Sequence, residues 1–439
     1  MDWPTKPLKE VCTIEKGAIG ITKATPGPYP LVTLAQERKE HSEYQFDARA
    51  VIIPLVSSTG HGHASIKRIH YQEGKFAVGT ILCAVMSKNE SDLDSLFLYH
   101  YLDVFKEQLL VPLMRGMANV TLPMKSLGEL EVPIPPISDQ LIWIKKFKSV
   151  YSKETELLEE LTHQQTLLKQ LRQAILQEAI QGQLTEGWRR AHPDTEPASA
   201  LLERIQAEKA RLVKEKKIKK PKPLPPIAAN EIPFELPEGW AWCRLGAVTN
   251  FIDYRGKTPS KVEKGIKLIT AKNVKGGFFS SEPEEFISES DYEKHMTRGI
   301  PNSGDVLFTT EAPMGNACLL KQKGIFALAQ RIITIQSISF SSEYLLHVIL
   351  AAPFQEQLLG KASGVTARGI KSSKLVEVVI PLPPLAEQQA IVEKVESLLV
   401  KVSQLEWEVE QNRQHAEQLL QSVLREVMQG ESVTKEAAS

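Results

Sequence analysis

Hydrophobic and polar residues alternate in two different ways along this chain. In two regions, roughly 1–136 and 237–384, short apolar runs are separated by Gly, Pro and Ser, a pattern typical of strands. The clearest runs are Ala50–Val56, Thr80–Val85, Asp305–Thr309 and Arg331–Ile335. Each region also has one amphipathic segment, Asp94–Leu110 or Ser342–Leu359, which predicts a helix. Both regions should therefore be mixed α and β domains of one topology.

Each of these regions is followed by a long segment with a helical pattern. Neither Pro nor Gly occurs between Pro136 and Gly182, or between Pro384 and Gly430, and these residue types mark helix starts and stops. At 1.5 Å per residue such a helix is about 66 Å long, far longer than an ordinary globular helix. A helix of that length needs a partner on which to bury its apolar side.

Apolar residues recur every seven positions in both long segments, which is the pattern of a coiled coil. The second segment has Val395, Val402, Val409, Ala416 and Val423, with leucines three residues later at 398, 405 and 419. The first has Phe147, Leu161, Leu168 and Ile175, with leucines at 157, 158 and 171 beside them and Glu154 in the remaining position. We predict that the two helices form an antiparallel coiled coil. The alternative is that each helix packs on its own domain.

The two halves of the chain are copies of one unit. Glu131–Gln140 contains Pro-Ile-Pro-Pro-Ile-Ser-Asp-Gln, and Val379–Gln388 contains Pro-Leu-Pro-Pro-Leu-Ala-Glu-Gln at an offset of 248 residues. The same offset holds without a gap to Gly182 and Gly430, and about a third of the paired residues are identical. The fold class is therefore α+β with a pseudo-twofold internal repeat. Its predicted parts are a first domain 1–136, a first helix 137–185, a linker 186–236, a second domain 237–384, and a second helix with tail 385–439.

The linker differs in composition from both halves. Residues 197–217 predict an exposed helix, and Lys214–Pro226 is a basic stretch that passes into a polyproline-like segment. A basic run can contact phosphates, but a solvated charge run is at least as typical.

Composition limits what the whole molecule can do. The chain has 53 Lys and Arg against 53 Asp and Glu, so no overall positive field draws it to a polyanion, and any nucleic-acid contact must come from local patches. Its four cysteines form no Cys-x-x-Cys pair and are expected to be buried thiols. The sequence has neither a membrane-length apolar run nor a signal-like N-terminus, so we expect a cytoplasmic protein without a membrane partner.

The common catalytic motifs are missing. The sequence contains no phosphate-binding loop, dinucleotide fingerprint, Asn-Pro-Pro-aromatic tetrad or His-Glu-x-x-His motif. Pro193-Asp194 and Glu215-Lys216-Lys217 resemble a nuclease set but lie in the linker. His61, His63 and His70 lack a fourth metal ligand at suitable spacing. We therefore expect no catalytic residues, no metal site and no enzymatic activity in this chain.

Loops of both domains carry the residue types that contact nucleic acid. Arg and Lys bind phosphates and guanine edges, Asn and Gln bind adenine edges, and Thr and Tyr bind either. The candidates in the first domain are Lys67, Arg68, Arg115, Asn119, Thr121 and Lys125. Those in the second are Tyr254, Arg255, Lys257, Thr258, Lys272, Asn273, Lys275, Thr366, Arg368 and Lys371. One such loop is often only a solvated surface, but 115–125 and 364–374 lie at matching places in the two copies.

The order of these parts resembles the specificity (S) subunit of Type I restriction–modification systems. The motifs that carry the resemblance are the helix starts Pro133–Gln140 and Pro381–Gln388 and the helix ends Gln181-Gly182 and Gln429-Gly430. The segments Glu196–Ile205 and Phe234–Trp240 resemble the inter-lobe region of one subgroup. The resemblance covers nearly the whole chain.

The resemblance implies a function in DNA recognition. Two target recognition domains would each read half of a bipartite site in double-stranded DNA. Two adenine methyltransferase (M) subunits would bind along the helices, and motor-nuclease (R) subunits would join for ATP-dependent cleavage. S-adenosylmethionine, ATP and Mg²⁺ would belong to those partners, with no cofactor bound by this chain. A rigid helical spacer would fix the half-site separation, as dimer geometry does for other DNA readers.

Two other classes of function stay open at this point. The chain could be a non-enzymatic coiled-coil scaffold with protein-binding lobes, or an enzyme such as the nuclease considered above. Substituting loop arginines separates the first class from a DNA reader, because only a DNA reader then changes the salt dependence of DNA binding.

Overall fold

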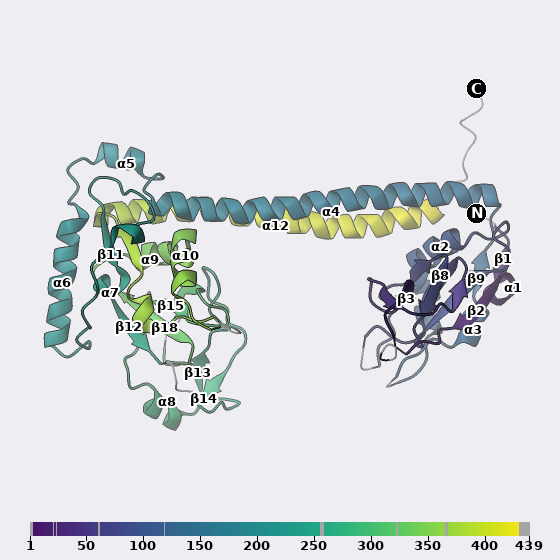
Figure 1. Cartoon of the computed structure of the whole chain (residues 1–439), viewed down its shortest axis with the longest axis horizontal. Helices are drawn as coiled ribbons and strands as arrows, with labels where there is room; N and C mark the ends of the chain where they lie inside the picture. Colours follow the sequence, from purple (N-terminus) through teal and green to yellow (C-terminus); the bar gives the residue numbers. More distant parts are fainter. Residues whose placement is uncertain are drawn as a thin grey trace. The chain divides into compact units, whose positions relative to one another are not determined.

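The computed structural model describes residues 3–20, 22, 24–59, 62–117, 119–254, 259–321, 324–364 and 368–429, with side chains at all of these except 421 and 425–429. The chain forms two compact units (Figure 1). One contains the first lobe with the start of one long helix and the end of the other, up to residue 163 and again from Val409. The other spans Gln164–Glu408.

The first lobe is built from two small sheets beside a helix. Its elements are β1 Thr5–Pro7, α1 Leu8–Val11, β2 Cys12–Lys16, β3 Tyr29–Val32, β4 Lys39–His41, β5 Phe46–Asp47, β6 Ala50–Pro54, β7 His70–Gln72, β8 Lys75–Val78, β9 Leu82–Ser87, α2 Ser95–Leu109, η2 Val111–Leu113, α3 Met124–Gly128 and β10 Glu131–Pro133. The strand orders are β2-β9-β6-β7, which is antiparallel throughout, and β4-β3-β8-β5. β1 pairs with β10 and so joins the start of the lobe to its end.

Strand β6 shows why its sequence is a continuous apolar run. Val51 and Ile53 belong to the core beneath α2, together with Phe97. Ile52 points to the opposite face and packs with Phe76 in a second core. Because successive side chains alternate across a strand, burial of both faces requires apolar residues at every position.

The second lobe has the same plan. Its elements are β11 Ala241–Arg244, α7 Leu245–Val248, β12 Thr249–Asp253, β13 Ile266–Ile269, β14 Phe286–Ile287, α8 Glu289–His295, β15 Val306–Thr309, β16 Ala317–Leu319, β17 Phe326–Leu328, β18 Ile332–Ser337, α9 Ser342–Leu350, α10 Ala352–Lys361, α11 Ser372–Leu375 and β19 Val379–Leu382. The order β12-β18-β15-β16 reproduces that of the first lobe's antiparallel sheet. The prediction of one shared topology is confirmed.

One predicted helix was wrong. The segment 342–359 forms two helices, α9 and α10, because Ala351 between them is extended and Pro353 follows. Proline has no N–H to donate to the carbonyl of Ile349, and its ring would clash with that carbonyl in a continuous helix. The side chain of Gln355 donates to this carbonyl instead, at 2.7 Å.

The long helices are α4 Ile137–Ile180 and α12 Leu385–Gln429, and each unit pairs a part of one with a part of the other. In the first unit Leu424 lies in the same core as Phe147. In the second, Arg172 forms an ion pair with Glu406 at 2.8 Å, while Thr185 beyond the end of α4 bonds to Glu387. As residue numbers rise along α4, the numbers of the paired residues on α12 fall, so the two helices are antiparallel.

Only one line of the predicted seam is buried. Phe147, Leu161, Leu168, Ile175, Val395, Val402 and Val409 are buried, and Ala416 and Val423 are half-buried. The leucines three positions later were expected to join the seam, but Leu405 and Leu419 are 44% and 63% exposed. Leu157 and Leu171 in the first helix are each 45% exposed. The helices thus keep a second apolar line on their surface.

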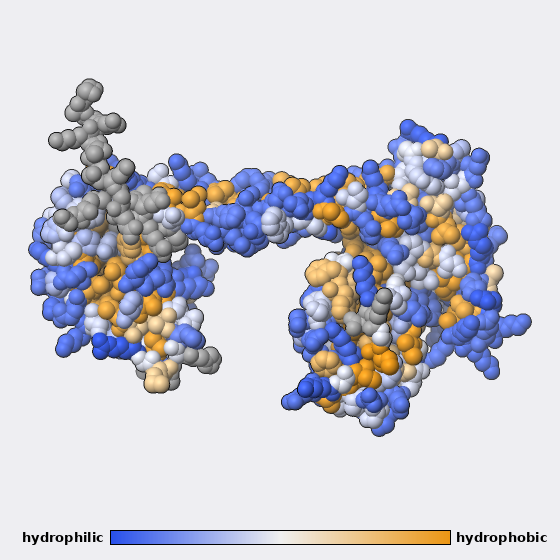
Figure 2. All heavy atoms as spheres, turned by 180° about the vertical axis from the view of Figure 1, so that it is seen from behind, coloured by the Kyte–Doolittle hydropathy of each residue, from blue (hydrophilic) through white to orange (hydrophobic). Residues whose placement is uncertain are grey.

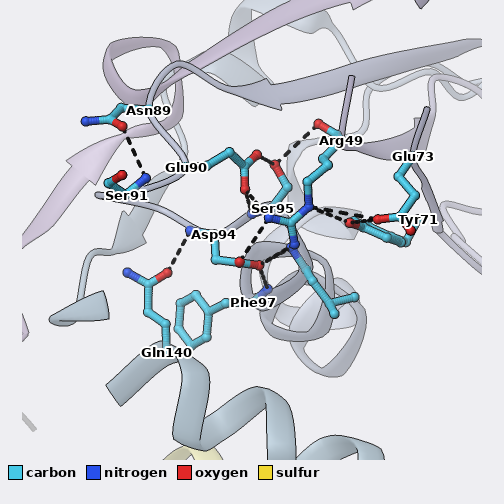
Figure 3. A network of polar contacts seen from close by, with 11 residues as sticks. Arg49, Tyr71, Glu73, Asn89, Glu90, Ser91, Asp94, Ser95, Phe97 and Gln140 are labelled. Carbon is cyan, nitrogen blue, oxygen red and sulfur yellow. Dashed lines mark hydrogen bonds and ion pairs between the residues drawn. The ribbon is translucent and has the colours of Figure 1, made fainter. Parts of the chain in front are cut away.

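The glutamine of the repeated proline motif fixes each lobe to its helix. Gln140 Nε2 donates to the Pro135 carbonyl at 2.8 Å. Its Oε1 accepts from the Asp94 N–H at 2.8 Å (Figure 3). Gln388 does the same with the Pro383 carbonyl and the Ser341 N–H. Both side chains are fully buried, so no water can replace these bonds.

Replacing Gln140 or Gln388 by alanine should lower the free energy of unfolding by about 2 kcal/mol, because buried backbone groups lose their partners. Chemical denaturation of each variant measures the loss. Gln389→Ala is the matched control, since this neighbouring glutamine is exposed and bonds only to Glu393. Equal stability of Gln388→Ala and Gln389→Ala would contradict this role.

His100 and His347 occupy the same position in α2 and α9, the sixth residue of each helix. Each is 6% exposed and neither imidazole has a hydrogen-bond partner. The pKa of each is lowered to about 4, and burial is the largest cause. Lys148 also lowers the pKa of His100, whereas Asp94 and Glu343 oppose the shifts of His100 and His347. Both rings are therefore neutral members of the core.

This burial predicts acid sensitivity. The unfolded state binds protons more tightly than the folded state, so stability is complete above pH 6.5 and falls as the pH drops toward 4. The loss at pH 4.5 should be on the order of 2 kcal/mol per histidine. His347→Phe should flatten the pH dependence of the unfolding free energy, whereas replacing the exposed His163 should not. An unchanged pH profile in His347→Phe would refute this account.

The described residues include all four cysteines of the chain. Cys12, Cys83, Cys243 and Cys318 are free and buried, as predicted, and burial raises the pKa of each thiol to about 12. Among the helices described, none is both long enough and apolar enough to cross a bilayer.

Candidate nucleic-acid interface

Each lobe presents one closed loop at the same place in the repeat. Arg115 and Thr121 exchange two backbone hydrogen bonds of 2.8 Å, and Ser363 and Gly369, 248 residues later, exchange two of 3.0 Å. The second residue of each loop is a glycine with positive φ, +121° at Gly116 and +110° at Gly364. A side chain is strained in this conformation, so glycine is required for the chain to turn there.

In the first lobe a neighbouring loop packs against this closed loop. The Ser57 N–H donates to the Val120 carbonyl at 2.9 Å. Gly62 approaches so closely that a Cβ on it would lie 2.4 Å from the Met117 carbonyl oxygen. Lys67, whose N–H bonds to Ser58, extends from the neighbouring loop into solvent. Two loops thus present one continuous surface.

That surface carries most of the first lobe's candidates. Arg115, Asn119 and Thr121 are exposed on the closed loop, and Lys125 is exposed at the start of α3. Arg68 is only half-buried, and its charge helps lower the pKa of the buried His70 to about 4, after the effects of burial and Arg38. Met117 at the tip is 95% exposed, and polarity-based reasoning from the sequence missed it.

In the second lobe the equivalent loop presents Arg368 to solvent, and Lys371, two residues beyond the loop, is also exposed. Gly369 is bridged to Glu311, and Glu311 forms an ion pair with Arg331 at 2.9 Å. Arg331 is a candidate that the sequence analysis missed, because it comes from a distant strand end and has no motif around it. Arg255, Lys257, Thr258 and Thr366 lie outside the described residues.

Two predicted contacts were wrong. Tyr254 is completely buried, where its hydroxyl donates to the Gly299 carbonyl at 2.6 Å. Asn273 is 1% exposed, and its amide bonds to Thr270, Ser280 and Pro283 to shape its own turn. Tyrosine and asparagine in a turn-rich segment serve equally well as internal hydrogen-bonding groups, and sequence does not distinguish the two uses.

The remaining candidates of this segment lie near the surface. Lys272 is exposed and lies 3.6 Å from Glu285, while Lys275 is half-buried. Among the residues described, no three His, Cys, Asp or Glu side chains gather as metal ligands. The exposed candidates of the two lobes carry cationic, amide and hydroxyl side chains, which are the groups that bind nucleic acid.

A second kind of exposed surface follows the long helices. In the second unit Leu171, Val400, Leu405 and Trp407 are 44–69% exposed, and Figure 2 shows hydrophobic side chains at the surface along these helices. Exposed apolar side chains on a charged helix are typical of a protein-binding surface.

Comparison with known proteins identifies the family. The family model of the Type I restriction modification DNA specificity domain matches residues 1–165 and again residues 237–411. The chain belongs to this family. The two matched regions are the two lobes with the adjoining parts of the long helices.

The chain is similar in sequence to several specificity subunits. The chain is 34% identical over 258 residues to the Type I restriction enzyme EcoAI specificity subunit of Escherichia coli, covering 56% of this chain and 42% of that one. It is 23% identical over 436 residues to the EcoDI specificity subunit of the same species, covering 98% and 89%. The matches with the EcoAI and EcoEI subunits thus span about two fifths of those relatives.

A solved structure has the same fold. It belongs to a study of the structural basis of complex assembly and conformational transition of the type I R-M system. The similarity covers 98% of both chains with a TM-score of 0.63 at 19% sequence identity.

Proposed function

We propose that this chain is the DNA sequence-recognition subunit of a Type I restriction–modification complex. The observation that carries the proposal is the pair of closed loops at equivalent positions of two lobes in a family named for DNA specificity. Each lobe reads one half of a bipartite target in double-stranded DNA.

The half-sites differ because the loops differ in chemistry. The first loop reads Arg-Gly-Met-Ala-Asn-Val-Thr and the second Ser-Gly-Val-Thr-Ala-Arg-Gly, so the arginine stands at opposite ends of the two. Arginine fits guanine O6 and N7, and asparagine fits adenine N6 and N7. The target is therefore asymmetric.

The helices set the half-site spacing and dock two adenine methyltransferase subunits on their exposed apolar side chains, which include Leu405 and Trp407. Motor-nuclease subunits join for cleavage. S-adenosylmethionine, ATP and Mg²⁺ belong to these partners, and the chain itself is not catalytic. The complex acts in the cytoplasm.

The isolated chain binds its target weakly, since its net charge is zero and basic surfaces of the methyltransferases supply part of the affinity. A pull-down of the tagged chain from its host lysate, with a mass for the complex, tests the assembly. Two methyltransferase copies per chain are expected. Recovery with only unrelated proteins would favour the scaffold alternative.

A further inference from the structure

The linker between the halves is fixed to the second lobe. Helix α5 spans Glu186–Ala191 and α6 spans Ala198–Lys214. Ala198, Leu201 and Ile205 on one side of α6 are buried, although the sequence predicted an exposed helix. The helix is amphipathic, and its apolar side is covered within the second unit.

A lysine holds the middle of α6 against this lobe. Lys209 Nζ donates to the carbonyl oxygens of Gly246 and Thr249, the latter at 2.7 Å. Gly246 is the second residue of α7 and Thr249 is the first of β12, so one ammonium group is bound by both elements. Burial lowers the pKa of Lys209 to about 8.

An arginine holds the proline-rich part that follows. Arg244 donates to the carbonyls of Pro225 and Pro226 and forms a two-bond ion pair with Glu231 at 2.7 Å. Its side chain is only 5% exposed. The basic stretch between Lys209 and Pro225 is therefore anchored at both ends, and its prolines restrict the backbone further.

The anchored stretch borders two hollows that are rich in cations. One is lined by Lys219, Lys220 and Lys222, by Asp253 at the end of β12, and by Ser372 and Ser373. The other is lined by Lys216, Lys217, Lys219 and Lys220 opposite Arg298 and Asn302. Figure 2 shows a strongly hydrophilic surface over the end of α6 from which this stretch continues.

In the described part of the chain, the three surface lysines of the first hollow have no anionic partner. All three are exposed, and none of the described carboxylates lies within ion-pair distance of Lys219, Lys220 or Lys222. Glu377 in the same hollow is already bound by Lys374 at 3.0 Å. Unpaired cations held close together repel one another, so an anion bound there is stabilised.

The position of the hollow indicates which kind of anion binds there. Ser372 and Ser373 directly follow Lys371, an exposed candidate two residues beyond the second lobe's closed loop. A duplex held by that loop and Lys371 would bring its sugar–phosphate backbone to the lysines of the hollow.

We propose that Lys219, Lys220 and Lys222 form a phosphate-binding site that holds duplex DNA beside the second half-site without reading bases. The proposal rests on the proposed function and adds an asymmetry to it, because this stretch occurs once in the chain. The site contributes affinity that is independent of DNA sequence.

The test compares two triple variants of the full chain. Lys219→Gln, Lys220→Gln and Lys222→Gln together remove three unpaired charges. Arg190→Gln, Arg204→Gln and Arg211→Gln remove three charges from the same linker, but these pair with Glu186, Glu196 and Glu208. Fluorescence anisotropy with a duplex of arbitrary sequence, between 50 and 200 mM salt, gives the slope of log affinity against log salt.

Three phosphate contacts correspond to a slope of about 2.7, since each contributes about 0.9. The variant in which the three lysines are replaced should lose most of this slope. The variant in which the three arginines are replaced should keep it. Equal slopes in all three proteins, or no binding by the unsubstituted chain at low salt, would overturn the site. The lysine substitutions could instead remove a copurifying protein and leave the salt slope unchanged. That result would show that the lysines bind an acidic protein surface, and it would also overturn the phosphate site. Methylation of the host target by the lysine variant is scored separately, so a failure here is distinguishable from a failure of the recognition function.

Discussion

We expect Glu387→Ala to lower the free energy of unfolding by about 3 kcal/mol, among the largest effects of any single substitution in this chain. The Glu387 carboxylate is fully buried and accepts hydrogen bonds from three side chains. These are Thr185 Oγ1 at 2.6 Å, Arg189 Nη1 at 2.5 Å and Trp240 Nε1 at 2.8 Å. Alanine removes this acceptor from all three donors, two of which, Thr185 and Trp240, are themselves buried.

The internal repeat supplies the control. Asp139 occupies the equivalent position at the start of α4, but it is half-exposed and bonds only to Ser138. Asp139→Ala should change the unfolding free energy by about 0.5 kcal/mol or less. Equilibrium denaturation of both variants makes the comparison. Similar losses in the two would show that Glu387 does not join the linker to the helix in the way described.

The second large effect concerns target choice. Arg368→Ala should weaken discrimination at one half-site by about 1–3 kcal/mol, roughly 5- to 150-fold, without changing the other half-site. Arg115→Ala should weaken discrimination at the other half-site instead. Both side chains are exposed, so neither variant is expected to lose stability. Each variant controls for the other, because a general loss of assembly would affect both half-sites together.

The measurement is methylation of a DNA library in which each base of the target is varied. Methylation should tolerate new bases in one half-site only, and the half-site should differ between the two variants. Loss of preference at both half-sites in either variant, or unchanged preference in both, would refute the division of reading between the lobes.

The repeat made the fold predictable to a large extent. Proline and glycine positions predicted the ends of α4 and α12, and matching apolar runs predicted one topology for two lobes. The heptad line from Phe147 to Ile175 is buried, yet the leucines beside it are exposed. Spacing alone predicts that an apolar residue packs against another surface. It does not show whether that surface belongs to the same chain or to a partner protein.

The candidate site was predictable only in part. The closed loops were found because they stand at matching places before the proline motif. Tyr254 and Asn273 were misassigned, since their polar atoms satisfy internal carbonyls and N–H groups that only the folded chain reveals. Arg331 was missed for the opposite reason, because the fold alone brings it beside Glu311.

The linker shows the same limit. Its lysines are visible in the sequence, but a flexible charged tether and a fixed basic surface have the same composition. The difference lies in Lys209 and Arg244, whose bonds to backbone carbonyls fasten the stretch to the second lobe.

The most direct test of the central claim is single-molecule methylation sequencing of the host genome with and without this chain. The account predicts one methylated motif that disappears with the chain. That motif has two different half-sites at a fixed spacing, each with one modified adenine. An unchanged methylation pattern, or a lost motif that is palindromic or has no spacer, would contradict it.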